Sequence, residues 1–164
     1  MNIYAHRGNS GFFPENTMYA FKKSLDLDIC GIELDVQKTK DGILVVHHDE
    51  TLGRVFDGKG YIKKLTFDQL VDSNLNNDEL ISRDDCKIPT LEEVLELIKP
   101  TNLTINIEIK MLDDDTIYQM ETFYRGGIQN FINYYSNIKF KCVDIKYHSS
   151  TNQVKYMLFE QITS

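Results

Sequence analysis

The sequence predicts an α/β fold, built as a partial (β/α) barrel with parallel strands. Short apolar or alternating segments typical of strands recur through residues 1–110, and segments with helical spacing separate them. No tight hairpin signature stands out between successive strands, so parallel βα units are the simplest arrangement. A complete barrel takes about 250 residues. This chain of 164 residues is therefore expected to form about the first half of one.

Four segments carry the strand patterns: residues 2–5, 31–36, 43–48 and 104–110. In the second segment, apolar side chains alternate strictly with Glu33 and Asp35, which therefore share one face of their strand. The fourth segment alternates in the same way and places Glu108 and Lys110 on one face. The first is short and apolar, and the third is apolar until it ends in two histidines.

Helix starts can be read from capping residues between these strands. Residues 16–27 place apolar side chains at helical spacing, with Asn16 or Thr17 as the N-cap. Thr66–Gln69 and Thr90–Glu93 each have the form of a capping box. The helix that follows the second box has apolar residues at i, i+3, i+4 and i+7, so it should lie against a sheet.

The chain beyond Lys110 follows this rhythm only weakly. We predict one more strand at residues 138–147 and a terminal helix at residues 151–159. The region 111–164 is thus expected to be a divergent tail added to the half-barrel.

Composition narrows the class of protein. A net charge of −7 and a pI near 5.0 argue against nucleic-acid binding, because nucleic-acid sites gather Lys and Arg. The three cysteines, Cys30, Cys86 and Cys142, have neither a disulfide framework nor a zinc spacing, which favours free thiols in a reducing compartment. No apolar run approaches the roughly 20 residues of a membrane span. We therefore expect a cytoplasmic protein.

The polar side chains of interest lie at the carboxyl ends of the predicted strands. In a parallel barrel these ends meet at one mouth, where such folds keep their active sites. Three carboxylates there, those of Glu33, Asp35 and Glu108, would repel one another unless a cation intervened. Oxygen ligands favour Ca²⁺ or Mg²⁺ over zinc, and such a cation can polarise a phosphoryl oxygen.

Histidines and cations complete the pattern. His6 and His48 can supply the two proton transfers of phosphodiester cleavage, one from the nucleophile and one to the leaving oxygen. Arg7 offers a planar fork for phosphate oxygens, and Lys110 offers a point charge. Each feature has a plainer interpretation: a Glu-x-Asp pair on a strand is usually a solvated face, and a loop histidine is usually just exposed. Strand alternation lets only one of His47 and His48 face the mouth.

Taken together, the residues resemble the glycerophosphodiester phosphodiesterase family, of the superfamily that includes the phosphatidylinositol-specific phospholipases C. The matching segments are Ala5–Gly8, Pro14–Thr17, Gly31–Val36, Thr39–Gly42, Val46–Asp49 with Thr51, Leu52 and Arg54, Ile88–Val94, and Asn106–Lys110. They keep the family's order and spacing over residues 1–110, so the match does not depend on one short motif.

The resemblance implies a TIM-barrel enzyme that hydrolyses glycerophosphodiesters to glycerol 3-phosphate and an alcohol. It implies these roles: Glu33, Asp35 and Glu108 bind Ca²⁺ or Mg²⁺, His6 and His48 form the acid and base pair, Arg7 and Lys110 bind phosphate, and Glu15 supports the substrate site. In that scheme His48 takes the catalytic place, because it precedes Asp49, and His47 does not. Residues 49–87 match the family's small insertion within a catalytic half-barrel of residues 1–110.

The pattern is lost after Lys110, which suggests a frameshift near Met111 or a truncation. A half-barrel exposes sheet edges, so the tail caps it, two chains self-associate through the edges, or the product is unstable. Two alternatives to the phosphodiesterase stay open here. One is an inactive remnant that still binds a divalent cation. The other is a lipid-cleaving relative of the sphingomyelinase D kind, which the insertion and the Ile88–Val94 segment disfavour.

Overall fold

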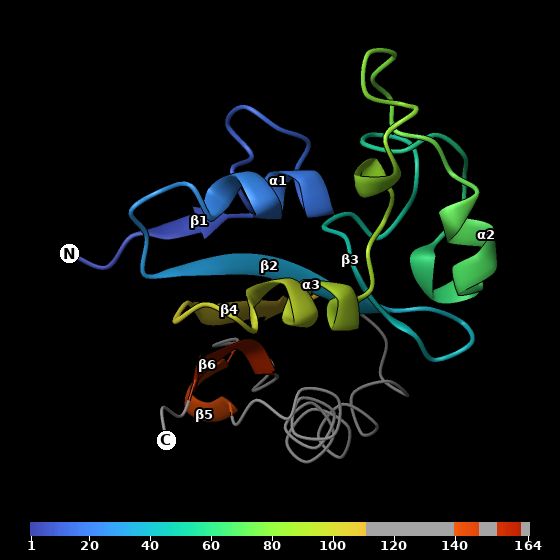
Figure 1. The fold of residues 1–164 in the computed structure, drawn as a ribbon. Coiled ribbons are helices and arrows are strands. Elements are labelled where there is room, and N and C mark those ends of the chain that lie inside the picture. Colours follow the sequence, from blue (N-terminus) through green and yellow to red (C-terminus); the bar gives the residue numbers. More distant parts are fainter. Residues whose placement is uncertain (111–139, 148–153, 162–164) are drawn as a thin grey trace.

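The computed structural model describes residues 1–110 and the strands Phe140–Tyr147 and Val154–Gln161. The elements, drawn in Figure 1, are β1 (Tyr4–His6), α1 (Met18–Ser24), β2 (Gly31–Lys38), β3 (Leu44–Val46), the 3₁₀ turn η1 (Ile62–Lys64), α2 (Phe67–Val71), the 3₁₀ turn η2 (Asp84–Cys86), α3 (Leu91–Ile98), β4 (Thr104–Ile109), β5 (Phe140–Tyr147) and β6 (Val154–Gln161). All four predicted strands of residues 1–110 are present.

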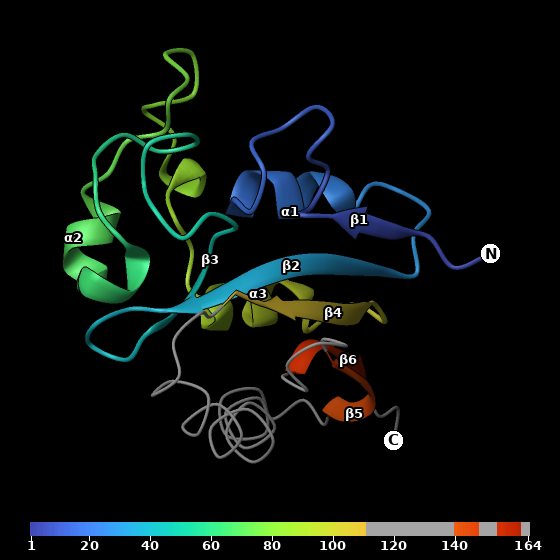
Figure 2. The same cartoon turned by 180° about the vertical axis from the view of Figure 1, so that it is seen from behind.

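One sheet organises the described chain, in the order β1-β2-β4-β6-β5, with β3 pairing to β2. β1 and β4 both run parallel to β2, on its two edges. α1 connects β1 to β2, and α3 precedes β4, so the chain forms two parallel β-α-β units, as predicted. Figures 1 and 2 show these helices beside the three strands from opposite sides.

The helix starts follow the capping residues. Thr17 caps α1 by accepting a hydrogen bond from the backbone N–H of Ala20. Thr66 and Thr90 both form complete capping boxes, with Gln69 and Glu93 respectively, at the starts of α2 and α3. Both expected capping boxes are thus confirmed, and each marks the first turn of its helix.

The third strand differs from the prediction in its direction. β3 runs antiparallel to β2, with Val46 opposite Val36, because the chain between them makes a tight turn. The Thr39 N–H donates to the Ile43 carbonyl at 2.9 Å, and Gly42 adopts a positive φ of 84°. The expectation that no hairpin joins successive strands was therefore wrong at this point, although the segment itself is a strand.

The tail follows the prediction in one part only. The strand predicted at residues 138–147 is confirmed as β5, whereas the predicted helix at residues 151–159 is wrong, because residues 154–161 form β6. β6 runs antiparallel to β4, with Tyr156 opposite Glu108, and antiparallel to β5. β4 otherwise presents unpaired backbone groups on this edge, and pairing with β6 satisfies them. A capping tail was one of the three expected outcomes for a half-barrel.

Two apolar clusters stabilise residues 1–110. In the main cluster, the apolar side chains of β2 and β4 pack against α1 and α3; examples are Leu34, Ile107 and Leu95, which are almost completely buried. A second cluster lies within and beside residues 49–87 and includes Val45, Phe56, Ile62, Leu70, Leu75, Cys86 and Ile88. The segment after β3 therefore has a small core of its own.

Two of the expected free thiols lie in the described part of the chain. Cys30 is exposed and Cys86 is buried, and both are free. Cys142 lies in β5, where the side chains are outside the described structure. Among the described residues, none of the helices has the length and apolar character that crossing a membrane requires.

Candidate metal centre and active site

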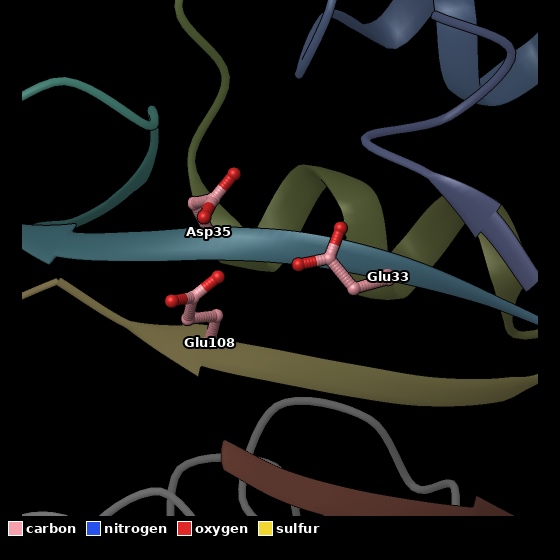
Figure 3. A group of neighbouring side chains, drawn as sticks. All are labelled: Glu33, Asp35 and Glu108. Atoms are coloured by element: carbon pink, nitrogen blue, oxygen red, sulfur yellow. The ribbon is translucent and has the colours of Figure 1, made fainter. Parts of the chain in front are cut away.

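Three carboxylates gather on the sheet face opposite α3. Glu33 and Asp35 project from alternate positions of β2, and Glu108 is the direct register partner of Asp35 on β4. Each of the three residues offers an oxygen, and these oxygens all lie within 4.8 Å of one another. Figure 3 shows the three side chains pointing to one place, with α3 behind the strands. The expected clustering of Glu108 with the two carboxylates of β2 is thus present in the structure.

The electrostatics of this cluster suit a cation. Burial, and next the negative charge of Asp35, raises the pKa of Glu33 to about 7. Asp35 is completely buried, and within the described part of the chain its Oδ1 accepts no hydrogen bond. A hard divalent cation coordinated by carboxylate oxygens would reduce the repulsion among the three clustered carboxylates. The donor set therefore fits Ca²⁺ or Mg²⁺, the ions expected from the sequence.

Cationic and amide groups surround Asp35. The Nε of Arg7 lies 3.1 Å from Oδ2 of Asp35, and the side-chain amide of Asn16 donates to the same oxygen at 2.9 Å. The Nζ of Lys110 lies 3.6 Å from Oδ1 of Asp35 and donates to Oε1 of Glu108 at 2.7 Å. Arg7 and Lys110 thus stand on both sides of the carboxylates, where they can also meet the oxygens of a phosphate.

The β1–α1 loop holds Arg7 and Asn16 in an unusual backbone conformation. Both have a positive φ, 57° for Arg7 and 54° for Asn16, which is uncommon for residues other than glycine. The Asn16 N–H donates to the Arg7 carbonyl at 3.0 Å. Gly8 packs so closely on α1 that a Cβ would lie 2.8 Å from the backbone of Ala20. Such conformations persist where the surrounding structure compensates for them, often at functional sites.

The two predicted histidines approach β2 from opposite directions along one edge. β4 occupies the other edge, so β1, paired at Gly31–Glu33, and β3, paired at Val36–Lys38, must share this edge. β1 ends at His6, opposite Glu33, while the chain leaving β3 bonds the His47 N–H to the Asp35 carbonyl at 3.0 Å. The β2–β3 hairpin therefore returns the chain to the carboxylates. A parallel third strand was expected to place the histidines there.

The side chains of the histidines lie in different surroundings. His6 is largely exposed (64%), and its Nε2 lies 3.8 Å from Oε2 of Glu33. His48 is 30% exposed, and its Nδ1 lies 2.8 Å from Oδ1 of Asp49. His47 is only 3% exposed and packs near the Phe56 ring of the second cluster. Burial also lowers the pKa of His47. His48 is thus the more accessible of these two histidines.

Glu15 contacts two arginines at the rim of the carboxylate cluster. Its carboxylate accepts from Nη1 of Arg7 at 3.3 Å and from Nη1 of Arg54 at 3.1 Å. Burial by itself would raise the pKa of Glu15, but the hydrogen bond and charge of Arg54 outweigh burial and lower it. Arg54 also pairs with Asp49. The contacts of Asn16, Asp49 and Arg54 were not predicted, although all three lie in the segments that carry the family resemblance.

Parallel β-α-β units with carboxylates, arginine, lysine and histidines at the strand ends define a (β/α)-barrel protein with a candidate cation and phosphate site. The chain belongs to the glycerophosphoryl diester phosphodiesterase family, whose sequence model matches residues 6–158. The match extends beyond Lys110, although the sequence motifs of the family end there.

Individual relatives align with about two thirds of the chain. A glycerophosphodiester phosphodiesterase of Caldanaerobacter subterraneus is 47% identical over 110 residues, 66% of this chain and 44% of that protein. Human glycerophosphodiester phosphodiesterase 1 is 41% identical over 112 residues, 67% of this chain and 34% of that protein. This chain thus spans less than half the length of the curated relatives it matches.

The chain superimposes on about half of each of two solved structures. A phosphodiesterase of Oleispira antarctica, solved with the product sn-glycerol-3-phosphate, superimposes with a TM-score of 0.69 at 29% identity, covering 82% of this chain and 53% of that one. A glycerophosphodiester phosphodiesterase of Agrobacterium tumefaciens gives a TM-score of 0.62 at 30% identity, covering 74% and 52%. The described chain is therefore a partial (β/α) TIM barrel, as the sequence predicts.

Proposed function

We propose that this chain hydrolyses glycerophosphodiesters to glycerol 3-phosphate and an alcohol, and that it needs a divalent cation to do so. The observation that carries the proposal is the cluster of Glu33, Asp35 and Glu108, with Arg7 and Lys110 beside it. The names of the relatives and the product bound to the Oleispira protein support the same reaction. Ca²⁺ and Mg²⁺ are the proposed ions, because the donors are all carboxylate oxygens.

The residues divide the work of the proposed reaction. When bound to the three carboxylates, the cation supplies Lewis-acid polarisation of a phosphoryl oxygen. Arg7 and Lys110 bind phosphate oxygens and stabilise the negative charge that grows as the water oxygen attacks phosphorus. One of His6 and His48 takes the proton of that water, and the other protonates the alcohol oxygen as its bond to phosphorus breaks. Glu15 holds Arg7 in place for this task.

The domain organisation is also a proposal. Residues 1–110 would form the catalytic part, residues 49–87 an insertion within it, and residues 111–164 a divergent tail that results from a frameshift near Met111 or a truncation. The motif segments that resemble the family, which end at Lys110, are the basis of this division, whereas the family model extends to residue 158. A family-like continuation in another reading frame of the source DNA would support the frameshift, and its absence would argue against it. Self-association through open sheet edges and a cytoplasmic location stay predictions.

An assay of glycerol 3-phosphate release tests the function directly. The wild-type chain should release it from sn-glycero-3-phosphocholine or a related diester with added Ca²⁺ or Mg²⁺, and a chelator should stop the release. An inactive remnant would bind the cation, with a measurable heat, yet release nothing from any of these diesters. The comparisons do not favour that alternative, and every residue proposed for the reaction is present in the described structure.

A further inference from the structure

Arg54 stands between two carboxylates at the edge of the site. Its Nε lies 2.6 Å from Oδ2 of Asp49, and its Nη2 donates to Oδ1 of Asp49 at 3.0 Å. Its Nη1 donates to Oε2 of Glu15 at 3.1 Å, while Nη2 also contacts Oε1 of Glu15. The planar guanidinium therefore holds both carboxylates at once in paired contacts. A lysine ammonium, being a point charge, does not reproduce this geometry.

Each of these carboxylates in turn contacts a residue of the proposed machinery. Asp49 Oδ1 lies 2.8 Å from Nδ1 of His48, and Glu15 Oε1 accepts from Arg7 at 3.3 Å. Arg54 is thus linked through Asp49 to His48, the proposed proton-transfer histidine. Through Glu15 it is linked to Arg7, the proposed phosphate-binding arginine. It touches neither of them in the contacts described.

The segment 49–87 fixes the backbone of Arg54. The side-chain amide of Asn76 donates to the carbonyls of Gly53 and Arg54, at 3.0 and 3.2 Å. The Asn76 N–H donates to the Val55 carbonyl at 2.8 Å, and Phe56, 1% exposed, lies in the second apolar cluster. The small core of this segment therefore determines where Arg54 can place its guanidinium.

We propose that Arg54 is a positioning residue: through Asp49 it fixes the ring tautomer and orientation of His48, and through Glu15 it fixes Arg7. This inference rests on the proposed function, since it assigns His48 and Arg7 their parts in the hydrolysis. It also gives the segment 49–87 a role in catalysis, through two of its side chains, Asp49 and Arg54.

The tautomer follows from the charge of Asp49. Asp49 is an ordinary carboxylate at neutral pH, and the hydrogen bond from Arg54 lowers its pKa further, so it is ionised; the paired contacts of Arg54 hold this ionised group against Nδ1 of His48. An ionised carboxylate only accepts hydrogen bonds, so the proton between it and His48 must sit on Nδ1. The Nε2 of neutral His48 is then left free of a proton, in the state that can accept one from the nucleophile.

Arg54→Met tests the proposal, because it removes the guanidinium but keeps an apolar stem of similar length. We expect kcat for glycerol 3-phosphate release from sn-glycero-3-phosphocholine, at saturating Ca²⁺, to fall about 10-fold to 100-fold, by more than KM rises. In the background Glu15→Gln/Asp49→Asn, adding Arg54→Met should cost less than about threefold more, since its targets are already gone. Nitrogen-15 NMR of the His48 ring at pH 8 should show the Nδ1–H tautomer in the wild type. In the variant, Asp49 stays ionised but is no longer held against Nδ1, so the populations should shift toward the Nε2–H tautomer.

Arg83→Met is the matched control. Arg83 lies in the same segment and makes a similar paired contact with Asp85, at 2.9 and 3.0 Å, but no described contact joins it to His48 or Arg7. This control should keep both kcat and the His48 tautomer. If Arg54→Met leaves both readouts unchanged, or if the control moves them equally, the proposal is overturned.

Two further arms keep the test decisive. Arg54→Lys keeps the charge but loses the fork, and its kcat should fall between those of the wild type and Arg54→Met; it carries the test if the Met variant does not fold. If the wild-type chain releases no glycerol 3-phosphate, the proposed function fails. The tautomer of His48 then still decides the role of Arg54, because the NMR measurement needs no turnover.

Discussion

Glu108 and Asp35 are register partners in the parallel β2–β4 pair, so their carboxylates lie side by side on one face of the sheet. The chain connects them through residues 49–87 and then α3, which places Glu108 far from Asp35 in sequence. Pairing of two strands, and no local motif, therefore brings the third carboxylate to Glu33 and Asp35. The three carboxylates repel one another, and a cation bound among them would relieve that repulsion.

The first prediction concerns cation binding by Glu108. Ca²⁺ at about 100 times its dissociation constant should stabilise the wild-type fold by about 2.7 kcal/mol, seen as a rise in Tm of roughly 5 to 11 °C. Glu108→Gln should lose this rise, because an amide replaces a charged ligand. Glu96→Gln is the control: Glu96 is an exposed residue of α3, 3.8 Å from Lys99, and its change should leave the rise intact. A full Ca²⁺ effect in Glu108→Gln would contradict the metal site.

The second prediction concerns pH. In the metal-free protein the pKa of Glu33 is about 7, raised by burial and then by the charge of Asp35. A cation binds the ionised carboxylate, so at pH 6 it must first displace a proton, whereas at pH 8 the proton is already gone. Affinity therefore rises with pH, and the Ca²⁺ dissociation constant should fall about tenfold between pH 6 and pH 8.

Isothermal titration calorimetry checks this pH dependence. At pH 6, repeating the titration in two buffers with different ionisation heats should reveal proton release on Ca²⁺ binding. Glu33→Gln, which has no proton to lose there, should bind more weakly and should lack most of the pH dependence. Equal affinity at both pH values in the wild type would show that Glu33 is already ionised at pH 6 or is not a ligand.

The third prediction separates His48 from His47. His48→Asn should lower kcat about 100-fold to 10,000-fold, the range for loss of a general acid or base. Its stability should change little, because the side chain is partly exposed. His47→Asn should do the opposite: it disturbs the contact with Phe56 and lowers the free energy of unfolding, while each folded molecule keeps its kcat. Urea unfolding and steady-state kinetics on both variants make the comparison. If His47→Asn lowers kcat and His48→Asn lowers stability instead, His47 is the catalytic histidine.

Much of the site could be predicted because its signals are local. Strict alternation along β2 and β4 indicated that Glu33 and Asp35 share a face and that Glu108 lies on the corresponding face of its own strand. Thr90 and Glu93 indicated where α3 begins, and the structure confirms that capping box. Once β2 and β4 pair in parallel, these local facts suffice to bring the carboxylates together.

The direction of β3 was missed although a signal was present. Asp41-Gly42 is a dipeptide typical of hairpins, and Gly42 does adopt a positive φ in the turn. The helix predicted at residues 151–159 had no such resolving signal. Its short apolar run fits both helical and strand periods, and the open edge of β4 decides between them. The contact of Arg54 with Glu15 could not be predicted either, because Glu15 lies 39 residues away in another loop, which folding brings to Arg54.

The fourth prediction concerns Asn16, which combines a positive φ of 54° with a hydrogen bond to the buried Asp35 carboxylate. Asn16→Ala loses the hydrogen bond and keeps the unfavourable φ, whereas Asn16→Gly loses the hydrogen bond but adopts this φ easily. A hydrogen bond to a charged group contributes about 1.5 to 3 kcal/mol, and the backbone cost at such a φ is about 1 kcal/mol. Both variants should therefore be less stable than the wild type in urea unfolding, with Asn16→Gly the more stable of the two by about 1 kcal/mol. If the two variants are equally stable, the left-handed conformation is not retained in them. If both match the wild type, the amide of Asn16 does not support Asp35, and its 2.9 Å contact contributes nothing measurable to the fold.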